Sequence, residues 1–595
     1  MAVGSNLPAV SQFVVTKQRI SLLPLFGAAV AAHPASDARR GLMSAMLTLV
    51  KRPSARDRDV IVGALKSLAS LVGGVRCEQE LMPQILAMAT HKTRERRAVA
   101  AQACGMLAQF VSDKRCDSLL ATLTMLADDD HAVVKSAVAA GAALLATTLS
   151  QSLSSESRRQ YAEVEDLVWR SLLDGSDAAT AAGVEQGADA LPVLAQWARG
   201  LGWLWSRLVP QLLSILKDTL SSKAPSSGES NRCAALLTAL QRLAPPLAAY
   251  VLEDGWLITP NVAPPSPTRG PDDEDAGDAS GSAYRIVGEA EACDAPHGEY
   301  TVVDGLQRWA PGVNVDAAGV EWEGLKSLLH DVVPHLMEEA ANLDRGSAVG
   351  RAITDQYATA LRRLCSVMGT HFVAHAVRPL FKRALGLSLR GAPGATGEAW
   401  GAAWRAETLL PLFSSGLLSC PALPGAHLRG ALRELIVRAA AKADGWGLNA
   451  SLLETVFVRV GRHPDVLPTV LSLLQRVATN SQEAVRAVVA ALLQSLVPVL
   501  STSQVASPVL PALLALSTDT SPLVVKSAVR ALTSLYLEVS DTEALRRVNE
   551  EVASLLERGP KEVIVEVMRA LMRGIPRANP ELRDGFMLSQ VLGLA

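Results

Sequence analysis

The side chains in this sequence best suited to chemistry are histidines spaced for one face of a helix. His371 and His375 are four residues apart, the spacing used by helical zinc ligands. No glutamate follows His371, and no third histidine, cysteine or carboxylate is placed to complete a site. His330 and His335 are five apart and point away from each other on a helix. We therefore expect no bound metal.

Other catalytic or redox signatures are also missing from the sequence. The glycines of residues 391–397 have neither a Lys-Ser/Thr pair nor a strand beside them, and no Gly-x-Ser-x-Gly turn or paired-carboxylate constellation appears. The 7 cysteines form no CxxC pair, and most lie on apolar helical faces. They are interpreted as reduced core thiols of a cytosolic protein. We predict a protein that is not an enzyme and needs no cofactor.

The most informative pattern is a repeated hexapeptide, Val-Val-Lys-Ser-Ala-Val, at residues 133–138 and 524–529. Leucines four apart, a polar turn and a second apolar helix surround each copy, which describes a helical hairpin. Weaker copies occupy residues 82–108 and 468–496. One hairpin cannot bury its own apolar face, so such units form arrays, here with a repeat of roughly 35–45 residues.

Charged and amide side chains recur at the same places in these hairpins, in the turn and at the start of the second helix. The structural interpretation is a ladder, in which each turn acid accepts hydrogen bonds from backbone amides or from the base of an adjacent repeat. The functional interpretation is a row of partner contacts. Turn acids before helices are commonly caps, so the ladder is favoured. Its predicted members are Asp128, Lys135, Asn480, Arg486, Asp519 and Lys526.

Two clusters are candidate partner contacts. Trp197, Trp203 and Trp205 lie within nine residues, and exposed tryptophans often anchor interfaces. Burial between adjacent helices is the favoured alternative. The basic cluster of Arg94, Arg96 and Arg97 is either a solvated helix start or a contact for an acidic partner, and Arg97 also occupies the position of a ladder base.

Composition favours an all-α chain. Of its 595 residues 49% are hydrophobic but only 4% aromatic, and strand patterns are missing. We predict an α-solenoid, a HEAT/armadillo-like superhelix of antiparallel helical hairpins. HEAT-like repeats are expected over 1–258 and 301–595, separated by a disordered acidic, proline-rich insertion at 259–300. A net charge of −2 argues against nucleic-acid binding. The apolar stretches 20–32 and 487–518 are interpreted as repeat helices, with no transmembrane helix.

Several short motifs, in the same order along the chain, resemble the C-terminal HEAT-repeat region of the RELCH family, whose members combine LisH, coiled-coil and HEAT-repeat segments. Each motif is weak alone, but their collinear order covers nearly the whole chain outside 259–300. They include residues 32–34, 49–53, 80–84, 91–97, 104–105, 191–197, 239–241, 363–365, 410–420 and 582–586.

The resemblance implies a non-enzymatic scaffold of membrane traffic. Such a protein links recycling endosomes and the trans-Golgi network by binding a Rab GTPase and an oxysterol-binding lipid-transfer protein, in support of sterol transport. It is cytoplasmic and reaches membranes only through its partners. The family's LisH and coiled-coil segments have no counterpart here, so we expect a fragment or a shortened relative, and leave its oligomeric state open. The alternative is a HEAT-repeat subunit of a stable ciliary, cytoskeletal or transport-receptor assembly.

Overall fold

The computed structural model describes the chain in twelve stretches, and every regular element within them is a helix. The predicted all-α class and helical solenoid are confirmed. The chain divides into two compact units, Met1–Tyr250 and Val251–Ala595. The predicted insertion at 259–300 and His371 lie outside the described residues. The described stretches are 2–14, 16–49, 52–151, 156–173, 181–220, 226–258, 323–343, 347–370, 372–385, 406–441, 450–539 and 541–593.

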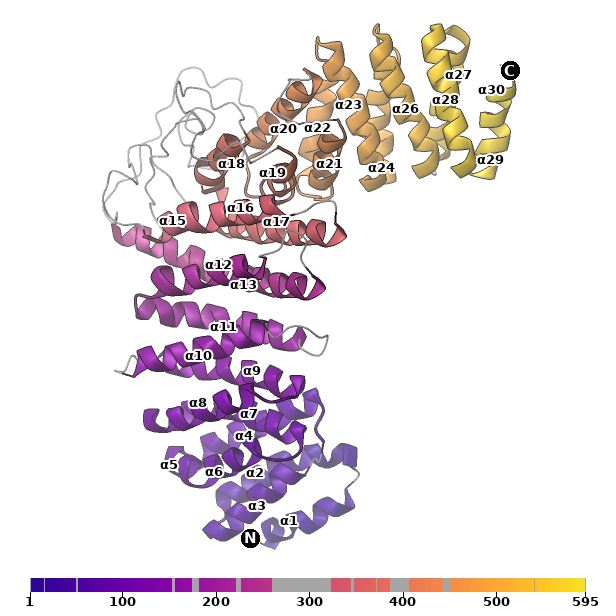
Figure 1. The fold of residues 1–595 in the computed structure, drawn as a ribbon. Coiled ribbons are helices and arrows are strands. Elements are labelled where there is room, and N and C mark those ends of the chain that lie inside the picture. The colour runs from indigo at the N-terminus through magenta and orange to yellow at the C-terminus, as the bar shows by residue number, and fades with distance from the viewer. Residues whose placement is uncertain are drawn as a thin grey trace, which may run out of the picture. The chain divides into compact units, whose positions relative to one another are not determined.

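The first unit is built from helices that pack in two layers (Figure 1). Helices α2, α4, α7, α9 and α11 pack one against the next and form one layer, while α6, α8 and α10 pack successively in the other. The bounds are α1 Ala2–Phe13, α2 Leu23–Ala32, α3 Ser36–Thr48, α4 Ala55–Val72, α5 Gly74–Arg76, α6 Met82–Ala89, α7 Arg94–Leu107, α8 Asp113–Ala127, α9 Ala132–Leu149, α10 Ser157–Leu173, α11 Ala181–Gly200, α12 Val209–Thr219 and α13 Ser227–Ile258.

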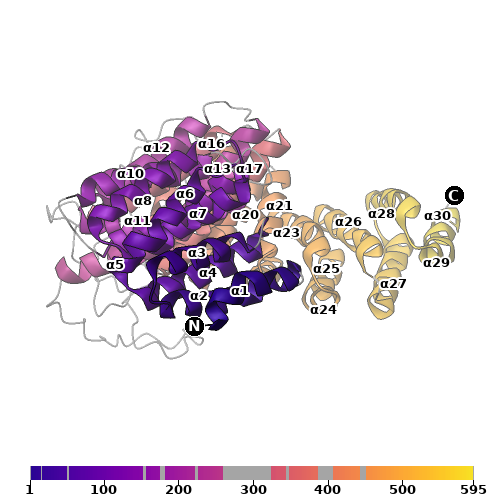
Figure 2. The ribbon, with the colours of Figure 1, turned by 90° about the horizontal axis from the view of Figure 1, so that it is seen from below.

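The second unit repeats this arrangement. Figure 2 shows α25 and α27 on one side of its final hairpins and α26 and α28 on the other, and α23, α26 and α28 pack in succession. The bounds are α15 Glu323–Ser327, α16 Val333–Asn342, α17 Ala348–Met368, α18 Arg378–Ala384, α19 Ala406–Leu412, α20 Gly425–Ala440, α21 Ala450–Gly461, α22 Leu467–Val477, α23 Glu483–Leu496, α24 Thr502–Gln504, α25 Leu510–Ser517, α26 Pro522–Glu538, α27 Thr542–Arg558, α28 Lys561–Gly574, α29 Pro580–Leu582 and α30 Leu588–Gly593.

Four first helices of hairpins share a local distortion before a proline. Each contains a π-helical turn, in which an amide N–H donates to the carbonyl five residues earlier, and a proline stands two residues after the turn ends. Proline has no N–H and its ring clashes with the carbonyl four residues before it, so a widened turn accommodates it. The turns are Cys77–Leu81, Leu204–Leu208, Leu328–Val332 and Val505–Val509, and the prolines are Pro83, Pro210, Pro334 and Pro511.

Small residues bring α7 and α9 into backbone contact. A Cβ atom on Gly105 would lie 2.1 Å from the carbonyl oxygen of Gly141, and a Cβ atom on Gly141 would lie 2.4 Å from that of Ala101. Among the described residues, α9 is the helix whose length and mean hydropathy of 1.7 would suit a membrane span. It packs between α7 and α11, with half of that window buried, so this packing accounts for its apolar composition.

We expect Gly105→Ala to destabilise the first unit by about 1–3 kcal/mol, because the new methyl group must push two backbones apart. Urea unfolding followed by circular dichroism measures this loss.

The matched control is Gly63→Ala, in the middle of α4, where an added Cβ meets nothing within 4 Å. This change should stabilise the protein by roughly 0.5–1 kcal/mol, because alanine has the better helix propensity. Equal effects of the two substitutions would contradict the close packing of α7 on α9.

Candidate functional site

Arg97, near the start of α7, joins its own hairpin to the next one. Its Nη1 donates to the carbonyls of His91 and Lys92, at 2.9 and 3.2 Å. Its Nε and Nη2 donate to the two carboxylate oxygens of Asp129, at 2.6 and 3.0 Å, and Nη2 also lies 3.4 Å from Nδ1 of His131. A guanidinium has five N–H donors. Four of those of Arg97 go to the two carbonyls and to the Asp129 carboxylate, and its side chain is only 16% exposed, so little is left for a second protein.

Arg486 repeats this arrangement in the second unit. It donates from Nη1 to the carbonyls of Asn480 and Ser481, six and five residues before it, and binds both carboxylate oxygens of Asp519, at 2.6 and 2.8 Å. Arg39 of α3 also donates to the carbonyls six and five residues before it and pairs with Glu80. Three arginines therefore tie a turn to the following hairpin.

The turn residues are held by a second recurring bond. Asp129 accepts the backbone N–H of His131 at 2.9 Å, and Asp519 accepts that of Ser521 at 2.8 Å. Asn480 accepts the N–H of Gln482 through Oδ1 at 2.9 Å. These bonds satisfy an amide at the start of each second helix.

The structure places some predicted ladder residues elsewhere. The acid bound by Arg97 is Asp129, whereas the predicted ladder acid, Asp128, is exposed and pairs with Arg170 of α10 at 3.2 Å. Lys526 pairs with Glu562 of α28 at 2.6 Å, and not with the acid of its own turn. Lys135 is partly buried on α9.

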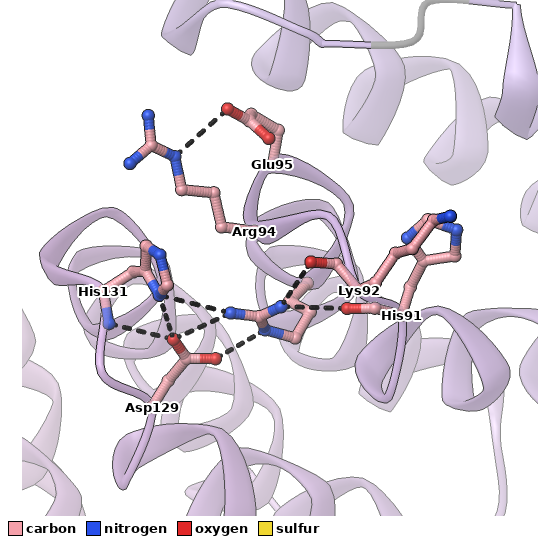
Figure 3. Close-up of polar contacts among 7 residues, drawn as sticks. His91, Lys92, Arg94, Glu95, Asp129 and His131 are labelled. Carbon is pink, nitrogen blue, oxygen red and sulfur yellow. Dashed lines mark hydrogen bonds and ion pairs between the residues drawn. The ribbon is translucent and has the colours of Figure 1, made fainter.

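The basic cluster of residues 94–97 does not form one patch. In Figure 3, the pair of Arg94 and Glu95 points away from the bonds that hold Asp129 and His131. Arg96 contacts Nε2 of His91 at 3.0 Å. The neighbouring guanidinium of Arg97 is only 16% exposed. Arg94, 53% exposed, is the freest of the three for a partner.

The tryptophan cluster is largely internal. Trp197 is 1% exposed and meets the Tyr161 ring edge-on, with centroids 5.3 Å apart. Trp203 is half-buried, packs on Tyr161, and carries the guanidinium of Arg207 over its ring at 4.8 Å. Trp205 is likewise half-buried. Burial between helices therefore accounts for Trp197.

Sequence reasoning missed a buried polar network around Glu165 of α10. The Glu165 side chain is 2% exposed and accepts hydrogen bonds from Arg207 Nε at 3.0 Å and from the Tyr161 hydroxyl at 3.3 Å. With its amide oriented to satisfy both neighbours, Gln211 bridges Glu165 and the indole N–H of Trp169. Burial raises the pKa of Glu165, against the lowering effect of Arg207. This network joins α10 to α12 and the turn before it.

No group of three or more His, Cys, Asp or Glu side chains in the described stretches is arranged to hold a metal ion. The six described cysteines are buried. Burial raises the pKa of the Cys77 thiol to about 11, far from the range of a reactive thiolate. These cysteines therefore behave as core residues.

Comparison with known proteins identifies two family models along the chain. The RAB11-binding protein RELCH N-terminal domain matches residues 1–252, and the RAB11-binding protein RELCH C-terminal domain matches residues 406–595. The RAB11-binding protein RELCH homolog of Danio rerio is 26% identical over 609 residues, covering 100% of this chain and 48% of the relative. RAB11-binding protein RELCH of Mus musculus is 26% identical over 621 residues, covering 100% and 47%. The chain thus spans about half the length of these curated relatives.

Solved structures similar to this chain include two nuclear-transport proteins. Kap121p bound to RanGTP has a TM-score of 0.37 and 12% identity, covering 97% of this chain and 51% of that one. Kap95p, solved in a study of RanGDP, has a TM-score of 0.37 and 11% identity, covering 97% and 65%.

We expect Arg97→Met to lower the free energy of unfolding by about 1–3 kcal/mol, because two carbonyls and a mostly buried carboxylate lose their donors. The control is Arg94→Met on the same turn of α7, which should change the stability by less than about 0.5 kcal/mol because Arg94 is exposed. Urea unfolding compares the two variants. Equal losses would show that Arg97 acts only through general charge.

Acid should weaken the link between Arg486 and Asp519. The Arg486 guanidinium, with the amide of Ser521, holds the pKa of Asp519 below its usual range. A lowered folded-state pKa contributes stability above the unfolded value, about 4, and loses it as pH falls through the folded value. The stability difference between the wild type and Asp519→Asn should therefore be full above about pH 5 and shrink below about pH 4.

At Glu165 the pH dependence of the stability should have the opposite sign, measured in the same series of urea titrations. Its raised pKa means that the folded state holds the proton more tightly than the unfolded state, so the stability of the wild type relative to Glu165→Gln should rise as pH falls. Parallel pH profiles for the two positions would contradict both assignments.

Proposed function

Because this chain belongs to the RELCH family, we propose that it is a non-enzymatic scaffold whose helical array binds a Rab GTPase of the RAB11 type. The observation that carries this proposal is the match of the N-terminal and C-terminal domains of the RAB11-binding protein RELCH to residues 1–252 and 406–595.

The finer proposal is a tether. A second surface of the array binds an oxysterol-binding lipid-transfer protein, and the two partners together link recycling endosomes to the trans-Golgi network in support of sterol transport. The mechanism is geometric, because holding two partners on one chain raises their effective concentration for each other. The cytoplasmic face of these membranes is the proposed location.

The internal bonding of the array supports a division between structural and recognition residues. Arg97 donates to Asp129 and to two turn carbonyls within the chain, and the acids Asp129 and Asp519 are each bound by an arginine and a backbone amide. Partner recognition is therefore expected from side chains other than Arg39, Arg97 and Arg486, such as Arg94 in the first unit.

We expect the chain of residues 1–595 to be retained by an immobilised RAB11-type GTPase locked in the GTP state and to be lost from the GDP-locked form. A GTPase effector discriminates the two states because the γ-phosphate orders the switch loops that it contacts. Affinity capture followed by quantitative immunoblotting measures the ratio, and Arg97→Met controls for damage to the array.

Equal recovery on the two nucleotide forms would count against Rab recognition. The competing role, a subunit of a stable assembly, predicts that the native protein elutes from cells as one large stoichiometric complex. Elution as a free chain would reject that role.

A further inference from the structure

The second unit contains a basic pocket between α20 and α22. Its volume is about 300 Å³. Leu473 and Val477 give it an apolar wall, and Asn480 of the following turn closes one end. Three arginines line the rest, Arg429 and Arg433 one helical turn apart on α20 and Arg476 at the end of α22.

These arginines differ from the ones that stabilise the array. Within the described part of the chain, the side chains of Arg429, Arg433 and Arg476 form no ion pair or hydrogen bond, whereas Arg438 on α20 pairs with Glu434 at 3.0 Å. Three like charges around one pocket repel one another, and an anion bound among them relieves this repulsion. The arrangement thus has positive charge that the fold itself does not neutralise.

We propose that this pocket binds an acidic segment of a protein partner, with a carboxylate among the three guanidinium groups. Guanidinium groups bind carboxylates through paired, charge-assisted hydrogen bonds. A volume of about 300 Å³ accommodates one or two side chains rather than a folded element. The proposal goes beyond the Rab-binding role and does not depend on it.

The composition of the wall favours a peptide over a phosphate group. Phosphate sites in proteins commonly use backbone amides at a helix N-terminus, whereas Arg433 and Arg476 lie in the middle of α20 and in the last turn of α22. The pocket opens between the sides of two helices, where an extended acidic segment can reach all three guanidinium groups.

Fluorescence anisotropy tests the proposal with a labelled short peptide of alternating glutamate and leucine, titrated with the chain of residues 1–595 in the absence of any GTPase. The matched probe replaces each glutamate with glutamine. We expect saturable binding of the glutamate peptide that weakens as salt is raised, and at least about tenfold weaker binding of the glutamine peptide.

Charge reversal then locates the site. Arg433→Glu should weaken binding of the glutamate peptide at least about tenfold, and Arg433→Lys less, because lysine keeps the charge but not the paired donors. Arg433 is exposed, so the fold should tolerate both changes, as circular dichroism will check. The control is Arg558→Glu, an exposed arginine at the end of α27, which should leave the affinity within about twofold.

Three outcomes would overturn the proposal. They are equal binding of the glutamate and glutamine peptides, equal weakening by Arg433→Glu and Arg558→Glu, and displacement of the peptide by inorganic phosphate or by phosphoinositide vesicles at concentrations below those of the peptide. Each differs from a failure of Rab capture, because no GTPase is present in this assay.

Discussion

The stacking of apolar helix faces is the interaction on which the rest of this structure depends. No hairpin here can cover its own apolar side, so α7, α9 and α11, and likewise α23, α26 and α28, bury theirs against one another. A fully buried leucine or valine contributes about 1.5–3 kcal/mol, several times the value of an ion pair near the surface, about 0–1 kcal/mol. Apolar burial therefore holds the array together. Gly105 and Gly141 show how close the approach becomes, since side chains there would separate the backbones.

Apolar packing is not directional, so it does not by itself set the register between neighbouring hairpins. Arginine side chains supply the directional bonds. Arg39, Arg97 and Arg486 each bind two carbonyls of the preceding turn and a carboxylate of the following hairpin. A planar guanidinium meets such partners only in a narrow range of geometries. These links fix the register between neighbouring hairpins, and they also satisfy turn carbonyls that would otherwise lose hydrogen bonds on burial.

The sequence predicted the all-α class and the repeated helical hairpin well, because both follow from periodic burial. It was less reliable for the turn acid. The turns before α9 and α26 have equal length, but α26 has two residues before the hexapeptide and α9 has one, so alignment through the hexapeptide selected Asp128 in place of Asp129. The Glu165 network has no periodic signal and joins residues about 40 apart in the chain. The basic pocket was equally hidden, since Arg433 and Arg476 meet only when α20 packs on α22.

Whether an arginine side chain already has bonding partners within the chain decides whether it can bind another protein. A mostly buried guanidinium that already binds two carbonyls and a carboxylate of the chain, such as that of Arg97, cannot gain a partner without breaking the link it already makes. An exposed one without an ion pair, such as Arg433 or Arg476, loses only water when an anion binds. Two arginines of the same chain thus have opposite roles for one physical reason. Recognition by a stacked helical array therefore depends on the charges that its own repeats do not neutralise.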